Sequence, residues 1–229
     1  MDSFLDLIFI PKCMFCSSVG RYICSSCLLK MSILEENLCV VCGCPSEHGF
    51  THQGCKTPGS PSQLLTVFNY CTLVRTVIKR SKYKNKEFLG LKIISELGAE
   101  LCKEELVLLS DYLLVPVPIS RARLKDRGFN QVETIVKAIS KRTGQKVKMK
   151  LIQRSMDTKA QYTYTRKERF ANVAGVFTVS LEFEKFVLGR KFLVVDDICT
   201  SGATLLEASK VLYKYGAKDV KCFALSKKL

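Results

Sequence analysis

Short apolar runs alternate with longer amphipathic segments from residue 61 to the end of the chain. The apolar runs predict strands at 65–70, 112–116, 147–151, 175–179 and 220–225, and a further strand from Phe192 up to a pair of carboxylates. Apolar residues at helical spacing predict helices at 73–80, 87–105 and 130–142, and one that begins near Ala203. Strands that alternate with helices favour a parallel sheet flanked by helices, and such open sheets bind ligands at the carboxyl ends of their strands. The sequence therefore predicts an α/β fold.

The first 60 residues lack this alternation, and the Pro-, Gly- and Ser-rich segment 56–62 reads as a linker. A chain of 229 residues accommodates one domain of about 150 residues and a small appendage. We expect a small N-terminal domain at 1–60 and a larger domain at 61–229.

The apolar segment 1–10 carries Asp2 and Asp6 where a signal peptide has basic residues, and Pro11 follows it. We therefore predict a short packing helix there. No apolar run reaches the roughly 20 residues that a membrane helix needs. The expectation is a protein of the cytoplasm with no membrane span.

The strand that begins at Phe192 leads into chemistry suited to a sugar phosphate. It ends in Asp196 and Asp197, whose carboxylates can accept hydrogen bonds from a vicinal diol. A loop with hydroxyls and backbone N–H groups at a helix N-terminus follows, and it can hold a phosphate. Its residues are Thr200, Ser201, Gly202, Ala203 and Thr204. The alternative is that the acids merely end a strand and the small residues merely cap the helix.

This run resembles the phosphoribosyl pyrophosphate (PRPP) signature of type I phosphoribosyltransferases. The resemblance implies that the two acids bind the ribose hydroxyls and the loop binds the 5-phosphate. It also implies a type I phosphoribosyltransferase-like sheet, with PRPP or a ribose phosphate as ligand and Mg²⁺ as a companion of PRPP.

Cysteine spacing predicts metal sites in the N-terminal domain. Eight of the 12 cysteines and both histidines precede residue 56, and four pairs share a two-residue gap. Two such knuckles complete the tetrahedral shell that zinc prefers, so four knuckles predict two structural zinc sites. In sequence order the ligands are Cys13, Cys16, Cys24 and Cys27, then Cys39, Cys42, His52 and Cys55. A crossed pairing satisfies the same spacing, and buried reduced cysteines or a redox-active pair are the alternatives.

Positive charge is concentrated in the larger domain. The chain has a formal net charge of +15, and between residues 75 and 169 there are 23 Lys and Arg against 10 Asp and Glu. Such an excess suggests an anionic partner larger than one sugar phosphate, and single-stranded nucleic acid is the natural candidate. The alternative is that the basic residues serve solubility alone.

Three basic segments carry the candidate contacts. Segment 75–84 interleaves basic, apolar and aromatic positions, which suits phosphate contact and base stacking but equally an amphipathic helix end. Segment 115–131 reads as a strand, a Pro turn and an Arg-rich loop in which Arg121 and Arg127 could hold a pyrophosphate. Segment 161–173 reads as a basic, aromatic loop that closes over a site. The predicted DNA-binding residues are Lys79, Lys82, Tyr83, Lys84, Arg123, Arg166 and Arg169.

The order of these segments, from the cysteine knuckles to the terminal signature, resembles the ComF family over nearly the full length. The resemblance implies a zinc ribbon joined to a phosphoribosyltransferase fold, required for DNA uptake in natural transformation and acting on the incoming single strand. A DNA-uptake helicase and other competence proteins are the candidate partners. Two positions depart from the family pattern: His52 stands where Cys is usual, and Ser201 where Thr is frequent.

No residue stands at a spacing that identifies an activator of an acceptor nucleophile, so the sequence leaves catalysis open. The main hypothesis is a competence protein that handles single-stranded DNA and binds PRPP or DNA phosphates. The alternatives are an active phosphoribosyltransferase of nucleotide metabolism and a PRPP-sensing regulator.

Overall fold

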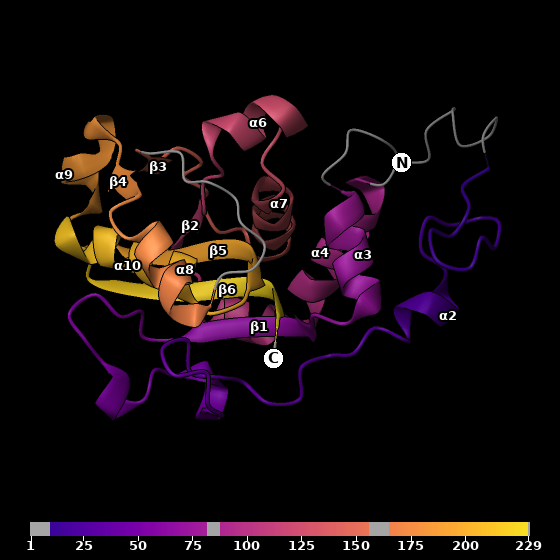
Figure 1. The fold of residues 1–229 in the computed structure, drawn as a ribbon, viewed down its shortest axis with the longest axis horizontal. Coiled ribbons are helices and arrows are strands. Elements are labelled where there is room, and N and C mark those ends of the chain that lie inside the picture. Colours follow the sequence, from indigo (N-terminus) through magenta and orange to yellow (C-terminus); the bar gives the residue numbers. More distant parts are fainter. Residues whose placement is uncertain (1–9, 82–87, 156–164, 229) are drawn as a thin grey trace.

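A parallel sheet forms the centre of the protein (Figure 1). The computed structural model describes residues 10–81, 88–155 and 165–228. Four strands pair in the order β1-β6-β5-β2, and every pair is parallel. Their bounds are Leu64–Asn69 for β1, Leu113–Pro116 for β2, Lys191–Cys199 for β5 and Asp219–Lys227 for β6. The predicted α/β fold is confirmed, and the strands predicted at 65–70, 112–116 and 220–225 agree with it to within two residues.

Both faces of the sheet are covered, which explains why its strands are nearly continuous apolar runs. In β5, Leu193 and Val195 face one core, and Phe192 and Val194 face the other. The first core is closed by α3 (Thr72–Arg80), α4 (Phe88–Leu101) and α7 (Val132–Thr143). The second is closed by α10 (Ala203–Lys214) and by the short strands β3 (Ile152–Arg154) and β4 (Phe177–Val179).

The segments 147–151 and 175–179 do not form strands of the main sheet as expected. Val147 makes a single parallel bridge to Leu114, and β3 pairs with β4 antiparallel in a separate two-stranded sheet. The apolar pattern marks these residues as buried, but it does not specify their pairing partners.

Local capping creates two helices where the sequence suggested loops. Helix α6 (Arg121–Arg127) begins where the Ser120 hydroxyl accepts from the Arg123 N–H, and it ends at Gly128 with a φ of +76°. Helix α8 (Arg166–Val173) begins with a capping box between Thr165 and Glu168. The predicted helix 87–105 is instead two helices, because the chain leaves helical geometry at Cys102 before α5 (Lys103–Val107).

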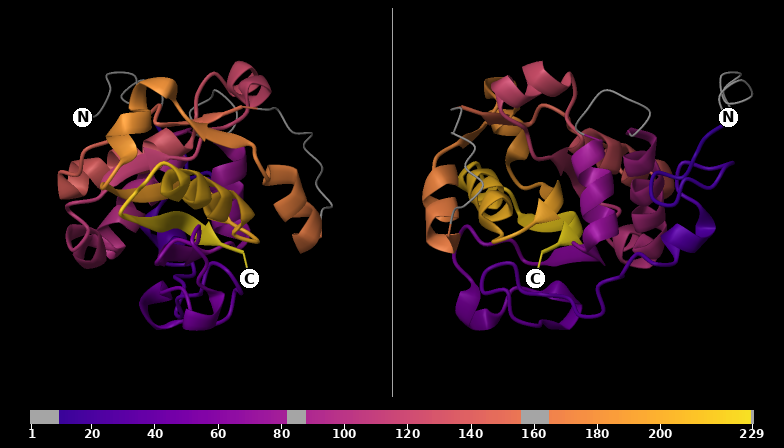
Figure 2. Two further views of the ribbon diagram at one scale, coloured as in Figure 1. Left: turned by 90° about the vertical axis from the view of Figure 1, so that its left-hand side faces the viewer. Right: turned by 45° about the vertical axis from the view of Figure 1, so that its right-hand side comes forward.

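The N-terminal region consists mostly of loops that run along the β1 edge of the sheet (Figure 1 and Figure 2). Leu34 N–H donates to the Val67 carbonyl and Asn69 N–H donates to the Ser32 carbonyl, at 2.8 and 2.9 Å, so this edge is partly covered. The helix predicted at 1–10 lies outside the described residues, apart from Ile10. The remaining short helices are α2 (Ser25–Leu28), α9 (Glu184–Val187), η1 (Glu47–Gly49), η2 (Gln53–Cys55) and η3 (Leu181–Phe183). None of the helices described here is both long and apolar enough to cross a membrane.

A glycine permits the close approach of α4 to the sheet. A Cβ added at Gly98 would lie 2.8 Å from Leu225 Cδ1 and 3.5 Å from Phe68 Cε2. We expect Gly98→Val to lower the free energy of unfolding by about 1–3 kcal/mol, because it overpacks this contact. Val is a better helix former than Gly, so propensity alone would stabilise this variant, and Lys92→Val, at an exposed position of the same helix, is the control for a Val that meets no buried neighbour. Chemical denaturation of both variants tests this, and equal losses would contradict it.

Candidate functional site

Two groups of four potential metal ligands form in the N-terminal region. Within each group all ligand atoms lie within 4.8 Å of one another. The structure brings together the sets expected from sequence order: Cys13, Cys16, Cys24 and Cys27 in the first cluster, and Cys39, Cys42, His52 and Cys55 in the second. Three or four thiolates with at most one imidazole form the donor set that zinc prefers in structural sites.

In the first cluster, backbone hydrogen bonds favour ionisation of Cys13. Burial opposes ionisation of Cys13, but backbone N–H groups of Cys16 and Cys24 lower its pKa to about 6. Burial raises the pKa of Cys27 to about 12. A bound cation would displace the proton of such a thiol, because a coordinating thiol is deprotonated.

The second cluster includes an oriented imidazole. His52 Nδ1 lies 3.3 Å from Cys42 Sγ, while its Nε2 lies 3.0 Å from the Pro45 carbonyl oxygen. A proton on Nε2 donated to that carbonyl leaves Nδ1 unprotonated for a metal. The Cys44 N–H, 3.4 Å from Cys42 Sγ, lowers the pKa of Cys42 to about 6. The substitution of His for Cys at position 52 is therefore compatible with metal binding.

The paired acids lie at the carboxyl end of β5. Val195 is the last fully buried apolar residue of that run, and Asp196 and Asp197 follow it, both partly exposed. The Asp197 N–H donates to Asp196 Oδ1 at 2.8 Å, so the Asp196 carboxylate is held against the backbone of its neighbour. Their position at the carboxyl edge is the one that open parallel sheets use for ligands.

The loop after β5 turns sharply into α10. Its turning residue is Gly202, with a φ of +81°, which forms the N-cap of the helix without any side-chain cap bond. A Cβ at Gly202 would lie 2.5 Å from the Val40 carbonyl oxygen, so only glycine fits. Gly202 therefore caps α10, and the Ser201 hydroxyl accepts from the Ala203 N–H at 3.5 Å, so the capping alternative stays open for the hydroxyls of Thr200, Ser201 and Thr204. Their role in phosphate binding stays a prediction.

The other predicted phosphate ligands lie on a neighbouring element. Because β2 pairs with β5, with Pro116 opposite Val195, helix α6 follows at the same carboxyl edge as the acids. Arg121 begins α6, and Arg127 near its end donates to Gln131 Oε1 at 3.0 Å. These arginines therefore project from a helix and not from the expected loop.

The predicted DNA-binding residues are distributed over three helices. Lys79 lies on α3, Arg123 on α6, and Arg166 and Arg169 on α8; Lys79, Arg123 and Arg166 are exposed. Of these four residues, only Arg166 and Arg169 lie beside the loop of residues 200–204, which we call the phosphate loop. Lys82, Tyr83 and Lys84, together with 161–164 of the third basic segment, lie outside the described residues.

A basic cavity of about 330 Å³ lies between α8, the phosphate loop and the second cluster. Arg166 donates to the backbone carbonyls of Val41 and Cys42, so this predicted DNA ligand also joins α8 to the N-terminal region. The lining residues are Leu38, Cys42, Gly43, Arg166, Arg169, Thr200, Ser201, Lys227 and Lys228. None of them is Asp or Glu, and the four cationic side chains outnumber the ionisable Cys42 thiol, so the cavity carries a net positive charge.

Sequence reasoning missed Lys227. It ends the last strand within an apolar context, and the pairing of β6 with β5 places it beside the phosphate loop, where its Nζ donates to the Thr200 carbonyl at 2.7 Å. A lysine at the end of an apolar strand is the only signal in the sequence, and it does not reveal this contact.

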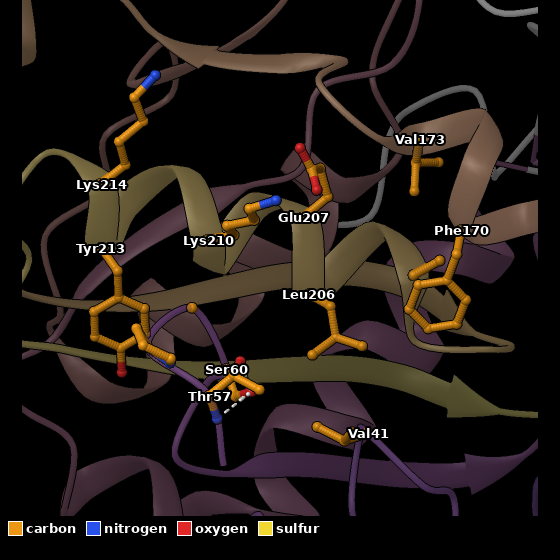
Figure 3. Close-up of a pocket in the computed structure, with 13 residues that line it drawn as sticks. Val41, Thr57, Ser60, Phe170, Val173, Leu206, Glu207, Lys210, Tyr213 and Lys214 are labelled. Atoms are coloured by element: carbon orange, nitrogen blue, oxygen red, sulfur yellow. Dashed lines mark hydrogen bonds between the residues drawn. The ribbon is translucent and has the colours of Figure 1, made fainter. Parts of the chain in front are cut away.

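A larger cavity of about 660 Å³ lies between α8, α10 and the segment 57–60 (Figure 3). Its walls are mainly apolar, with Phe170 and Val173 from α8 and Leu206 from α10. Glu207, which lies beside it, accepts a hydrogen bond from the Gly175 N–H at 2.7 Å. Neither of the paired acids lines this cavity, and Ala203 is the one predicted phosphate-binding residue that it shares with the candidate sugar-phosphate site.

Two protein-family models match separate parts of the chain. The double zinc ribbon domain matches residues 4–57, which contain both ligand clusters. The phosphoribosyl transferase domain matches residues 142–229, which contain β5, the phosphate loop and β6. Together they agree with a zinc ribbon followed by a phosphoribosyltransferase-type sheet.

The curated relatives of this chain are named for competence or for DNA utilization. Competence protein ComFC of Streptococcus pneumoniae is 32% identical over 159 residues, which cover 69% of this chain and 66% of that protein. Competence protein F of Haemophilus influenzae is 25% identical over 90% of this chain and 90% of its own length. DNA utilization protein YhgH of Escherichia coli is 28% identical over 90% of this chain and 91% of its own length. With two ligand clusters ahead of a phosphoribosyltransferase-type sheet, the chain belongs to the ComF family.

Proposed function

We propose that this protein handles incoming single-stranded DNA in natural competence, with two zinc ions in its N-terminal clusters and with PRPP or DNA phosphates at its carboxyl-edge site. The observation that carries the proposal is the basic cavity beside the phosphate loop. Four cationic side chains, Arg166, Arg169, Lys227 and Lys228, line it, and none of the other lining residues is Asp or Glu. The names of the relatives, which refer to competence and DNA utilization, support the same role.

The proposed zinc ions are structural. Each cluster supplies four protein ligands, which leaves no open coordination position for a substrate. The N-terminal loops bury few apolar residues, so metal binding would supply much of their folding free energy.

The proposed sugar-phosphate site combines the acids at the end of β5 with the loop before α10. A vicinal diol would be bound by the carboxylates, and a phosphate by the hydroxyls and N–H groups of residues 200–204. Arg121 and Arg127 would hold the pyrophosphate of PRPP from α6, with Mg²⁺ neutralising part of its charge.

The second candidate function is phosphoribosyl transfer, favoured by the intact pair Asp196 and Asp197. A transferase also needs a group that positions or activates the acceptor, and the sequence reveals none. Turnover of PRPP with a panel of bases and amines, measured on a preparation whose single-strand binding is known, distinguishes the two functions.

Metal content provides the first test. We expect about two zinc ions per chain by elemental analysis, and about one after Cys16→Ser or Cys42→Ser, because each change removes one of four ligands. Cys44→Ser is the matched control, since Cys44 lies beside the second cluster without belonging to it, and it should retain about two. A well-folded wild-type protein without zinc would exclude the assignment.

Ligand affinity at the sugar-phosphate site provides the second test. Replacing Asp196 and Asp197 by Asn should weaken PRPP binding by about 1–3 kcal/mol for each charge-assisted hydrogen bond lost, as measured by calorimetry with and without Mg²⁺. Asp111→Asn is the control, because Asp111 pairs with Lys191 at the opposite edge of the sheet. Unchanged affinity in the double variant would assign the two acids to structure.

Single-strand binding provides the third. The logarithm of the binding constant for an oligothymidylate should fall linearly with the logarithm of the salt concentration, with a slope of about −0.7 per phosphate neutralised. Replacing Lys79 and Arg123 by Ala should flatten the slope, whereas Lys30→Ala, outside the basic stretch, should not. Absence of binding at low salt together with PRPP turnover would favour the metabolic enzyme.

A further inference from the structure

Lys227 is a buried lysine at the carboxyl end of β6. Only 5% of its surface is exposed. Its Nζ donates to the Thr200 carbonyl oxygen at 2.7 Å and lies 3.7 Å from Cys199 Sγ. An ammonium has three N–H donors, so these two neighbours leave at least one donor for another acceptor.

Within the described part of the chain, no carboxylate forms an ion pair with this ammonium. The nearby Cys199 stays a neutral thiol at pH 7, because burial raises its pKa above the ordinary value. A buried charge is costly unless an opposite charge compensates it, so an external anion would fulfil that need.

The ammonium borders the basic cavity described above. Thr200 and Ser201 line the same cavity and bring hydroxyl and backbone groups to it. Arg166 and Lys228, which also line it, are exposed, so positive charge continues from the buried Lys227 to the protein surface. A polymer with repeated negative charges can follow such a path, whereas a single sugar phosphate does not need it.

The N-terminal region forms the opposite wall of the cavity. Cys42, a member of the second cluster, and the adjacent Gly43 line it, and the Arg166 guanidinium donates to the Val41 and Cys42 carbonyls. The Val40 carbonyl packs against Gly202 of the phosphate loop. The cavity therefore requires both regions of the chain in their docked positions.

We propose that this cavity is a phosphodiester subsite, which adjoins the sugar-phosphate loop and shares Thr200 and Ser201 with it, and in which Lys227 supplies the buried counter-charge to one backbone phosphate of a single strand. This inference rests on the proposed function and locates the strand at the junction of the two regions. Ala203, on the helix side of the loop, lines the apolar cavity instead, which separates the two surfaces of the loop.

The test uses the full chain and Lys227→Met, which keeps the aliphatic stem and removes the charge. Affinity for an oligothymidylate at low salt should fall about tenfold, and the salt slope should flatten by about 0.7, the value for one phosphate contact. Lys228→Met should flatten the slope without disturbing the buried packing. Lys218→Met is the control, because it removes an exposed positive charge next to the opposite end of β6.

Two further measurements locate the anion. Inorganic phosphate should raise the melting temperature of the wild type by more than that of Lys227→Met, which keeps only the sugar-phosphate loop as a phosphate site, and the variant should be at least as stable as the wild type without phosphate. Ribose 5-phosphate should bind both proteins equally. If the variant loses ribose 5-phosphate affinity but keeps strand affinity, the cavity belongs to the sugar-phosphate site and the inference is wrong.

Strand binding by the wild-type protein distinguishes a failure of this inference from a failure of the proposed function on which it rests. No binding of the strand by the wild-type protein at low salt would contradict the proposed function itself. Wild-type binding with an unchanged slope in both Lys227→Met and Lys228→Met would overturn the subsite alone.

Discussion

The parallel pairing of β5 with β6 is the constraint on which the candidate site depends. The two strands run together from Lys191 opposite Asp219 to Cys199 opposite Lys227. Because both are buried on two faces, a shift of one residue would move every side chain of a strand into the opposite core, where its shape does not fit the packing. This register places the acids, the phosphate loop and the end of β6 at one edge, and it determines that Lys227 contacts the loop.

The N-terminal region is part of this edge and does more than stabilise the protein. The backbone between its ligands Cys39 and Cys42 supplies three carbonyl groups. The Val40 carbonyl contacts Gly202, and the Val41 and Cys42 carbonyls accept from Arg166. The phosphate loop is therefore supported from outside by backbone that a metal would hold in place. Metal binding would then be coupled to any anion binding, because loss of the cluster geometry would remove one wall of the basic cavity.

Charge in this protein has structural as well as binding roles. Arg166 uses its guanidinium to join two regions, and Arg127 donates to Gln131 within the α6–α7 segment. Lys227, which the composition does not distinguish from the other lysines, is the one whose ammonium is buried against the loop. The net positive charge by itself favours an anionic partner, whereas burial is what sets Lys227 apart from a solvated surface lysine.

The sequence by itself determined the strongly periodic elements, the two ligand clusters and the acid pair with its loop, because periodicity and short spacing are local properties. It did not determine α6 and α8, since the capping bonds of Ser120 and of Thr165 with Glu168 outweighed the loop-like composition. It also left the pairing of β3 with β4 undecided, because an apolar run carries no information about its partner. Only the tertiary structure placed the second cluster, Arg166 and Lys227 around one cavity, because residues far apart in the chain meet there through packing and strand register.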